Sequence, residues 1–178
     1  VDGEWHISTR TADGNTAEFR ARAVVNAAGP WVESVLRETT EVAPARKLRL
    51  VKGSHIVVPR LYDGNHAYIL QNDDRRVIFV IPFEQDFSLI GTTETSHSGS
   101  PADAVVETAE VEYLCAAVSQ YFSNPVTASD VVWKFAGVRP LDDTDGEAMT
   151  AVTRDYAFNI DGDTTEPPLL SIFGGKLT

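Results

Sequence analysis

The sequence predicts an α+β fold, with a mixed, largely antiparallel sheet and helices on one face. Three observations lead to this prediction. Many short apolar or alternating segments are separated by turn residues, whereas few segments have helical periodicity. The chain of 178 residues is 43% hydrophobic, which is ample for a buried core, and it contains no internal repeat. Many strands around few helices are typical of a sheet that helices cover on one side.

The first part of the chain predicts a hairpin and then a strand–turn–helix segment. Residues 4–10 alternate between polar and apolar side chains, Asp13-Gly14 is a strong turn signal, and residues 16–22 form the returning strand. A short apolar strand at residues 23–27 leads to a glycine, and the proline after it suits the first turn of a helix. We expect the inner side of this helix to carry Trp31, Val35 and Leu36.

Most of the remaining chain is rich in strand-like segments. Residues 75–81 become continuously apolar after a charged start, which predicts a strand that is buried on both faces. The polar residues 72–74 predict a hairpin turn before it. The candidate strands are residues 47–58, 67–71, 75–82, 87–93, 130–136, 148–153, 156–160 and 169–173.

One long amphipathic helix interrupts these strands. It begins either at residues 100–103, which resemble a capping box, or later, near Glu107. Glutamates load its start, where they interact favourably with the helix dipole, and Asn124-Pro125 ends it. Its apolar stripe consists of Val111, Leu114, Cys115, Val118 and Phe122.

Composition and charge argue against several classes of protein. The net charge is −11, whereas nonspecific nucleic-acid binding and polybasic membrane contacts need a basic surface. One cysteine permits no disulfide within the chain and fits a cytoplasmic protein. No metal site is expected, because the histidines are scattered and the aspartates of residues 142–145 lack calcium-loop spacing. The first residues do not resemble a signal peptide, and both ends look like cuts within a longer chain.

Two residues next to apolar strands are candidates for chemistry. His55 follows Lys52 and Gly53 in an apolar strand, where it is either an acid–base group or a structural histidine. Arg139 ends an apolar strand before a proline, where it either binds a phosphate or carboxylate or forms an ordinary ion pair. The residues alone leave both alternatives open.

Three turns are weaker candidates. Residues 26–31 (NAAGPW) place small side chains between a strand and a helix, either beside a ligand phosphate or only in a tight turn. The hydroxyl of Thr93, at a strand end, either binds a ligand or caps the loop. In FGGKLT (173–178) the glycines permit close approach of a flat ligand, and Lys176 brings a positive charge to that point.

The order of these motifs resembles the FAD-dependent (respiratory) glycerol-3-phosphate dehydrogenases, which belong to the wider D-amino-acid-oxidase-like flavoproteins. The resemblance covers essentially the whole chain. KGSHIVVPR, GVRPL and FGGKLT together are specific for the narrower family. The motifs in chain order are VVNAAGPW, RLVKGSHIVVP, AYILQNDDRRVIFVIPF, IGTTE, GVRPL, TRDY and FGGKLT.

The resemblance implies an enzyme that oxidises sn-glycerol 3-phosphate to dihydroxyacetone phosphate, with FAD as cofactor and quinone as electron acceptor. It implies a cytoplasmic protein that lies peripherally on the cytoplasmic membrane. The chain would comprise part of an FAD-binding domain (1–45), a D-amino-acid-oxidase-like substrate domain (46–168) and a strand returning toward the FAD domain (169–178). The Gly-x-Gly-x-x-Gly turn of such enzymes is missing from this sequence. We therefore expect the whole protein, and not these residues alone, to hold FAD and be active.

The resemblance also implies roles for individual residues. His55 takes the substrate proton, and Arg139 and Lys176 hold the anionic substrate and polarise its oxygen. Arg154 and Thr93 are further substrate contacts. The expected cofactor contacts are Ala27, Gly29, Gly175, Lys176, Leu177 and Thr178.

Two alternatives to this function remain. Arginine binds a carboxylate as well as a phosphate, so another flavoenzyme of the superfamily, which oxidises an amine or a 2-hydroxyacid, is the first. The second concerns the 178 residues by themselves, which would then form a non-catalytic module that binds an anion.

Overall fold

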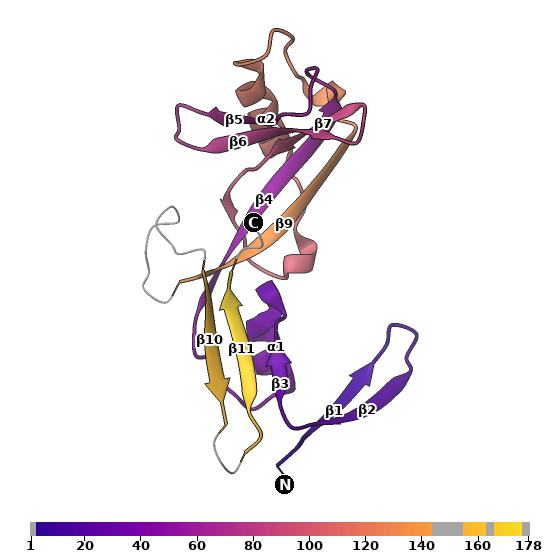
Figure 1. Cartoon of the computed structure of the whole chain (residues 1–178), viewed down its shortest axis with the longest axis vertical. Helices are drawn as coiled ribbons and strands as arrows, with labels where there is room; N and C mark the ends of the chain where they lie inside the picture. Colours follow the sequence, from indigo (N-terminus) through magenta and orange to yellow (C-terminus); the bar gives the residue numbers. More distant parts are fainter. Residues whose placement is uncertain (1–2, 144–154, 163–165, 176–178) are drawn as a thin grey trace. The chain divides into compact units, whose positions relative to one another are not determined.

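The computed structural model describes residues 3–143, 155–162 and 166–175 (Figure 1). The chain divides into two compact units, the first made of Val1–Arg49 with Pro140–Thr178 and the second of Leu50–Arg139. Antiparallel strand pairs dominate and helices are few, so the α+β prediction is confirmed. The chain rejoins the first unit at residue 140, earlier than the predicted boundary at residue 169. The division into cofactor and substrate domains stays a prediction.

The first unit begins with the predicted hairpin. Its strands β1 (Trp5–Arg10) and β2 (Thr16–Ala21) pair antiparallel. Gly14 has a φ of +88°, a conformation that favours glycine, and its amide donates to the carbonyl of Thr11 (2.9 Å). The Asp-Gly signal in the sequence therefore marks the turn correctly.

A three-stranded sheet forms the rest of this unit, in the order β10–β11–β3. β11 runs antiparallel to β10 and parallel to β3. The strands are β3 (Val24–Asn26), β10 (Tyr156–Asp161) and β11 (Leu169–Gly174). The predicted strand at residues 148–153 lies outside the described residues.

The short helix α1 (Val32–Thr39) packs on this sheet after a 3₁₀ turn at Gly29–Trp31. Trp31 is 43% exposed, so its predicted inner position is wrong. Because the 3₁₀ turn delays the α-helix by a few residues, Val32 takes the inner position one turn before Leu36. The small core consists of Val32, Leu36, Leu169 and Phe173.

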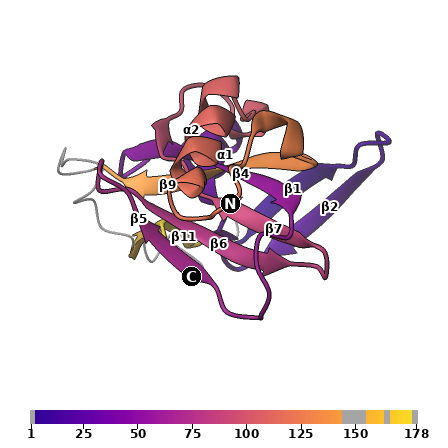
Figure 2. The ribbon, with the colours of Figure 1, turned by 90° about the horizontal axis from the view of Figure 1, so that it is seen from above.

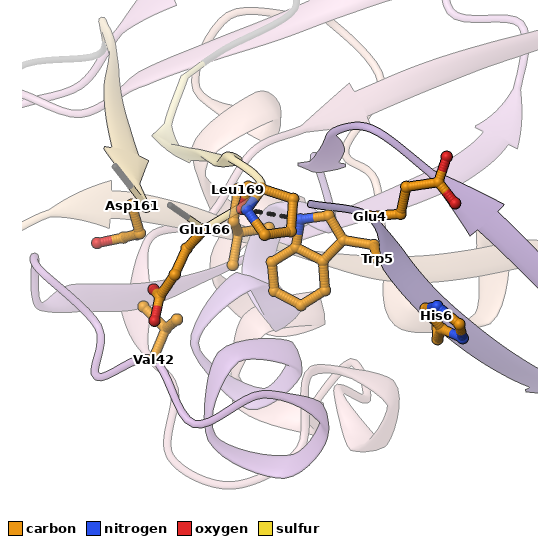
Figure 3. Close-up of a pocket in the computed structure, with 9 residues that line it drawn as sticks. Glu4, Trp5, His6, Val42, Asp161, Glu166 and Leu169 are labelled. Atoms are coloured by element: carbon orange, nitrogen blue, oxygen red, sulfur yellow. Dashed lines mark hydrogen bonds between the residues drawn. The ribbon is translucent and has the colours of Figure 1, made fainter. Parts of the chain in front are cut away.

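A cavity of about 530 Å³ lies in the first unit beside the indole of Trp5 (Figure 3). The indole nitrogen donates to the carbonyls of Pro167 and Pro168, both at 3.1 Å. The charged or titratable side chains that line the cavity are Glu4, His6, Asp161 and Glu166. Over the part of the chain that the structure describes, no three histidine, cysteine, aspartate or glutamate side chains are grouped closely enough to hold a metal ion.

No described helix has the length and apolar character to cross a bilayer.

The second unit is built on a larger, mostly antiparallel sheet. Its strand order is β5–β6–β7–β4–β8, and β9 also pairs with β4. The predicted hairpin turn at residues 72–74 joins β5 and β6. The strands are β4 (Leu48–Pro59), β5 (Tyr68–Gln71), β6 (Val77–Phe83), β7 (Phe87–Gly91), β8 (Thr95–Ser96) and β9 (Trp133–Asp142).

The long helix α2 (Thr108–Ser119) lies across one face of this sheet (Figure 2). It begins at Glu107, the later of the two predicted starts, because Glu107 and Glu110 form a reciprocal capping box. Ser100 instead caps a separate 3₁₀ turn at Pro101–Asp103. The core under α2 consists of Ile56, Val58, Leu70, Ile78, Val80, Ile90, Val111, Leu114, Cys115, Ala117, Val118 and Val126.

Strand β6 is buried on one face only, so the prediction of a strand buried on both faces is wrong. Ile78 and Val80 are fully buried under α2, whereas Val77, Phe79 and Ile81 are 39–41% exposed. A continuous apolar run does not distinguish two buried faces from one buried face and one apolar surface. The sheet of the second unit therefore has an apolar face on the side away from α2, which is called the open face below.

A buried ion pair joins β4 to the start of α2. The ammonium of Lys52 lies 2.9 Å from a carboxylate oxygen of Glu110, and the two residues are 5% and 6% exposed. The same ammonium donates to the Glu107 carboxylate (3.0 Å) and to the carbonyl of Val105 (2.9 Å). All three of its donors thus have partners. Burial lowers the pKa of Lys52, but the bonds and charges of Glu110 and Glu107 outweigh it and hold the pKa above its ordinary value.

The carboxylate of Glu110 extends this network to β4 and to the residues after β7. Glu110 accepts hydrogen bonds from the hydroxyl of Thr93 (2.7 Å) and the amide of Glu107 (3.0 Å). The Thr93 hydroxyl in turn accepts from the amide of Ser54 (2.9 Å). Burial raises the pKa of Glu110, but these donors and Lys52 outweigh it, so the pKa lies below its ordinary value. The stabilisation is therefore lost as pH falls through this lowered pKa.

Replacing Lys52 with methionine tests this network, since it leaves the Glu110 carboxylate buried without its cation. Removing one partner of a buried pair typically costs about 3–5 kcal/mol, and we expect the free energy of unfolding to fall by this amount in urea denaturation. Glu107→Gln is the matched control, because that side chain is 68% exposed and its contribution is about 0–1 kcal/mol. Equal losses in the two variants would contradict the account.

Candidate active site

Successive side chains of a strand point to opposite faces of its sheet, and this holds for Lys52-Gly-Ser-His55. Lys52 and Ser54 lie on the α2 side, within the buried network. His55 lies directly opposite Gly91 on β7, which lies directly opposite Phe79 on β6. Residues opposite each other in a sheet share a face, so His55 belongs to the open face with Phe79. One motif thus supplies both a structural anchor and a candidate catalytic group.

The imidazole of His55 is held between a glycine and an aromatic ring. A Cβ at Gly91 would lie 2.1 Å from Cδ2 of His55, so the ring occupies the space that any other residue at position 91 would fill. The ring of Phe135 stacks on the imidazole, with centroids 5.0 Å apart and planes inclined by 6°. These two contacts fix where the imidazole lies.

The environment of His55 favours the neutral imidazole. Burial and, to a lesser extent, the nearby Arg139 guanidinium lower the pKa of His55 below its ordinary value. Its Nδ1 atom is buried and has no hydrogen-bond partner among the described residues. A neutral imidazole is able to accept a proton at neutral pH. The geometry therefore fits the acid–base alternative for His55.

Arg139 reaches the same open face from β9. Positions 133, 135, 137 and 139 share one face of a strand, and Phe135 of this set stacks on His55. Nη2 of Arg139 lies 3.2 Å from a carboxylate oxygen of Glu94, without the alignment of a hydrogen bond. A Cβ at Gly53 would lie 3.4 Å from this nitrogen. Buried polar atoms on His55 and Arg139 that lack aligned partners within the described chain mark a place where polar groups of a ligand fit.

Thr93 has a different position from the one that the resemblance implied. It is 1% exposed, and its hydroxyl is engaged by Glu110 and by the amide of Ser54. This hydroxyl points into the buried network and away from the open face, so the structure does not support direct contact with a substrate. Thr93 instead anchors the segment that carries Gly91 and Glu94.

The candidate cofactor contacts of the first unit gather at one edge of its sheet. The NAAG turn lies at the carboxyl end of β3 and Gly174-Gly175 at that of β11, and these are neighbouring parallel strands. Nucleotide cofactors bind at such edges. Ala27 is exposed, and a Cβ at Gly29, where φ is +56°, would meet no atom within 4 Å. These residues therefore fit the close approach of FAD.

Gly175 has a second, purely structural reason to be glycine. Its φ is +92°, and a Cβ there would lie 3.2 Å from the side chain of Tyr156 on the adjacent strand. Its amide donates to the carbonyl of Asp155 (3.1 Å). The cofactor role of Gly175 stays a prediction. The predicted contacts Arg154, Lys176, Leu177 and Thr178 lie outside the described residues.

Sequence reasoning missed four residues that shape these sites. Alternation along residues 133–139 could have placed Phe135 beside Arg139, and the acidic end of GTTE could have drawn attention to Glu94. Asn26 stabilises the NAAG turn, because its side-chain amide donates a hydrogen bond to the carbonyl of Val32 (3.0 Å). No signal in the sequence shows that the ammonium of Lys52 contacts two carboxylates at the start of a helix that is distant in sequence.

The fold and these two sites define the class of protein. Residues 1–174 match the family described as FAD dependent oxidoreductase (DAO). The chain belongs to this family. The expected D-amino-acid-oxidase-like flavoprotein relationship is therefore confirmed, together with FAD as the cofactor of the family.

Individual relatives narrow the comparison. The chain is 46% identical over 176 residues to a glycerol-3-phosphate dehydrogenase of Pseudomonas aeruginosa, covering 99% of this chain and 34% of the relative. It is 47% identical over 178 residues to D-erythritol 1-phosphate dehydrogenase of Brucella abortus (99% and 35%). It is 42% identical over 178 residues to the aerobic glycerol-3-phosphate dehydrogenase of Escherichia coli (99% and 36%). The chain thus spans about a third of the length of these relatives.

Two solved structures share the fold of this chain. The glycerol-3-phosphate dehydrogenase of Bacillus halodurans, complexed with FAD, superposes with a TM-score of 0.76 at 31% identity, covering 97% of this chain and 32% of that one. L-α-glycerophosphate oxidase of Mycoplasma pneumoniae shares the fold, with a TM-score of 0.61 at 16% identity and coverage of 94% and 43%.

Gly91→Ala tests the place of the imidazole. The added methyl group forces the ring away from Phe135 and toward solvent, so we expect the pKa of His55, followed by NMR titration, to rise toward its ordinary value. Overpacking should also cost about 1–3 kcal/mol of stability. Gly137→Ala, on the same face, is the control, because its methyl group meets nothing within 4 Å. An unchanged His55 titration in Gly91→Ala would refute the geometry.

Proposed function

We propose that the whole protein is an FAD-dependent dehydrogenase that oxidises sn-glycerol 3-phosphate to dihydroxyacetone phosphate. One observation carries the proposal: a histidine, whose pKa burial and the nearby Arg139 lower, lies with that arginine on an apolar sheet face. This arrangement occurs in a chain of the FAD dependent oxidoreductase family, and its relatives include proteins named glycerol-3-phosphate dehydrogenase.

The residues of the open face suit the oxidation of a secondary alcohol. FAD, when bound, supplies the acceptor for the hydride that leaves the alcohol carbon. His55 accepts the proton of the reacting hydroxyl at its imidazole. Arg139 donates hydrogen bonds to the substrate, and Lys176 and Arg154 supply further positive charge for the phosphate. Phe79 and Phe135 give this face apolar surface beside the polar groups, and Phe135 stacks on the imidazole.

D-erythritol 1-phosphate is a second candidate substrate, because the Brucella abortus relative named for it is 47% identical. Both compounds are phosphorylated polyols with a secondary alcohol. Comparing how each compound reduces the flavin of the full-length protein under anaerobic conditions distinguishes the two candidate substrates. Glycine, sarcosine and 2-hydroxyglutarate test the amine and 2-hydroxyacid alternatives. Reduction by one of these three, and by neither polyol phosphate, would replace the proposal.

We also propose quinone as the electron acceptor, and a position on the cytoplasmic face of the cytoplasmic membrane. Both follow from the resemblance to respiratory dehydrogenases. Substrate-dependent reduction of a soluble quinone analogue by the full-length enzyme tests the first proposal. Sedimentation of the full-length protein with membrane vesicles tests the second.

Arg139→Ala in the full-length enzyme should weaken both substrate binding and turnover. Hydrogen bonds to charged groups contribute about 1.5–3 kcal/mol, which corresponds to a loss of roughly 10- to 100-fold in kcat/KM. Arg76→Ala is the control, because Arg76 lies over the ring of Tyr113 on α2 (3.9 Å), away from the open face. Unchanged steady-state kinetics in Arg139→Ala would refute the role of Arg139.

The 178 residues expressed alone should be colourless. The NAAG turn fits the cofactor, but the sequence lacks the Gly-x-Gly-x-x-Gly turn that binds the pyrophosphate of FAD. We therefore expect no visible flavin absorbance after purification, whereas the full-length protein should be yellow. A stoichiometric flavin band from the 178 residues would show that they suffice for binding.

A further inference from the structure

Glu94 lies on the open face beside Arg139, and the sequence motif did not assign it a role. Its carboxylate is 3.2 Å from Nη2 of Arg139, and the two side chains are 29% and 28% exposed. The preceding residue, Thr93, points inward and is anchored by Glu110. This anchor holds the backbone of the segment in place, and the carboxylate itself is held by its ion pair with Arg139.

The pair has no net charge, and this limits what it binds well. A phosphate dianion gains little from a guanidinium whose charge an adjacent carboxylate offsets. A hydroxyl group, by contrast, needs one acceptor and one donor, and the pair offers both. His55, on the same face, is assigned to the reacting hydroxyl. The pair therefore suits the group on the carbon next to the reacting alcohol.

We propose that Glu94 accepts a hydrogen bond from the hydroxymethyl group beside the reacting alcohol and rejects a carboxylate at that position. Glu94 is then a specificity-determining residue that favours polyol phosphates over phosphorylated 2-hydroxy acids. The inference rests on the proposed oxidation of a polyol phosphate. The proposal also assigns the two ends of the substrate to different groups. The Arg139–Glu94 pair binds the polyol, and other cations hold the phosphate.

Three substrates that differ in one group test the proposal. Glycerol 3-phosphate carries a hydroxymethyl group beside the reacting alcohol, 2-hydroxypropyl phosphate a methyl group, and 3-phosphoglycerate a carboxylate. We would measure kcat/KM for each with the full-length FAD enzyme and its Glu94→Gln variant, or the inhibition constant where turnover is too slow. The methyl compound is the internal reference, since it responds to any general change in Arg139 or in phosphate binding.

In Glu94→Gln, the preference for glycerol 3-phosphate over the methyl compound should fall about tenfold, because the charged acceptor is replaced by a neutral amide oxygen, which accepts a weaker hydrogen bond. The preference for 3-phosphoglycerate over the methyl compound should rise about tenfold, because a repulsive charge is removed. A merely structural role for Glu94 would shift all three compounds together. Both preferences remaining within about threefold of wild type would overturn the proposal.

Glu94→Asp keeps the test decisive if Glu94→Gln does not fold. The shorter carboxylate should lose the hydroxyl contact but retain the charge, so only the preference for glycerol 3-phosphate should fall. Wild-type preferences in Glu94→Asp would overturn the proposal in that case. A wild-type enzyme that glycerol 3-phosphate does not reduce at all would instead refute the proposed function, and the inference with it.

Discussion

The ion pair between Lys52 and Glu110 is the interaction on which the candidate site depends. It joins the middle of β4 to the first turn of α2, in an environment where neither charge is stable alone. Three partners for the ammonium and four donors to the carboxylate, Thr95 among them, offset the cost of burying both charges. Such a network has few alternative arrangements, so it fixes the strand and the helix in one relationship.

The consequences reach the open face through the backbone. Ser54 and Thr93 are held by the network, and their neighbours on the other face are therefore held as well. Gly91 leaves room for the imidazole of His55, and Glu94 meets Arg139. A catalytic constellation needs this kind of support, because a displacement of about 1 Å is enough to lower the rate substantially. The buried face thus positions the groups of the open face.

Local signals predicted much of this fold. Period-two alternation, the Asp-Gly turn and the helical stripe of α2 placed most strands and the long helix, because short-range geometry decides these elements. The prediction for residues 75–81 was wrong, since an apolar open face resembles a buried one in sequence. Trp31 was misplaced because a 3₁₀ turn shifted the start of α1. Tertiary packing decides which faces are buried and where a helix starts, and local sequence signals do not show it.

The same limit applies to the sites. Motifs pointed to His55 and Arg139, and the structure brings both to one face. Motif reading also selected Thr93, whose hydroxyl points inward, and passed over Phe135 and Glu94, which are on the open face. A residue on a strand changes face with each step along the chain, so membership of a motif does not decide contact with a ligand.

A crystal structure of the full-length protein with FAD and dihydroxyacetone phosphate would test the central claim, that the open face receives the substrate, most directly. We predict the ketone oxygen within hydrogen-bond distance of His55 and the terminal hydroxyl between Glu94 and Arg139. A product bound elsewhere, with no contact to His55, Glu94 or Arg139, would contradict the account.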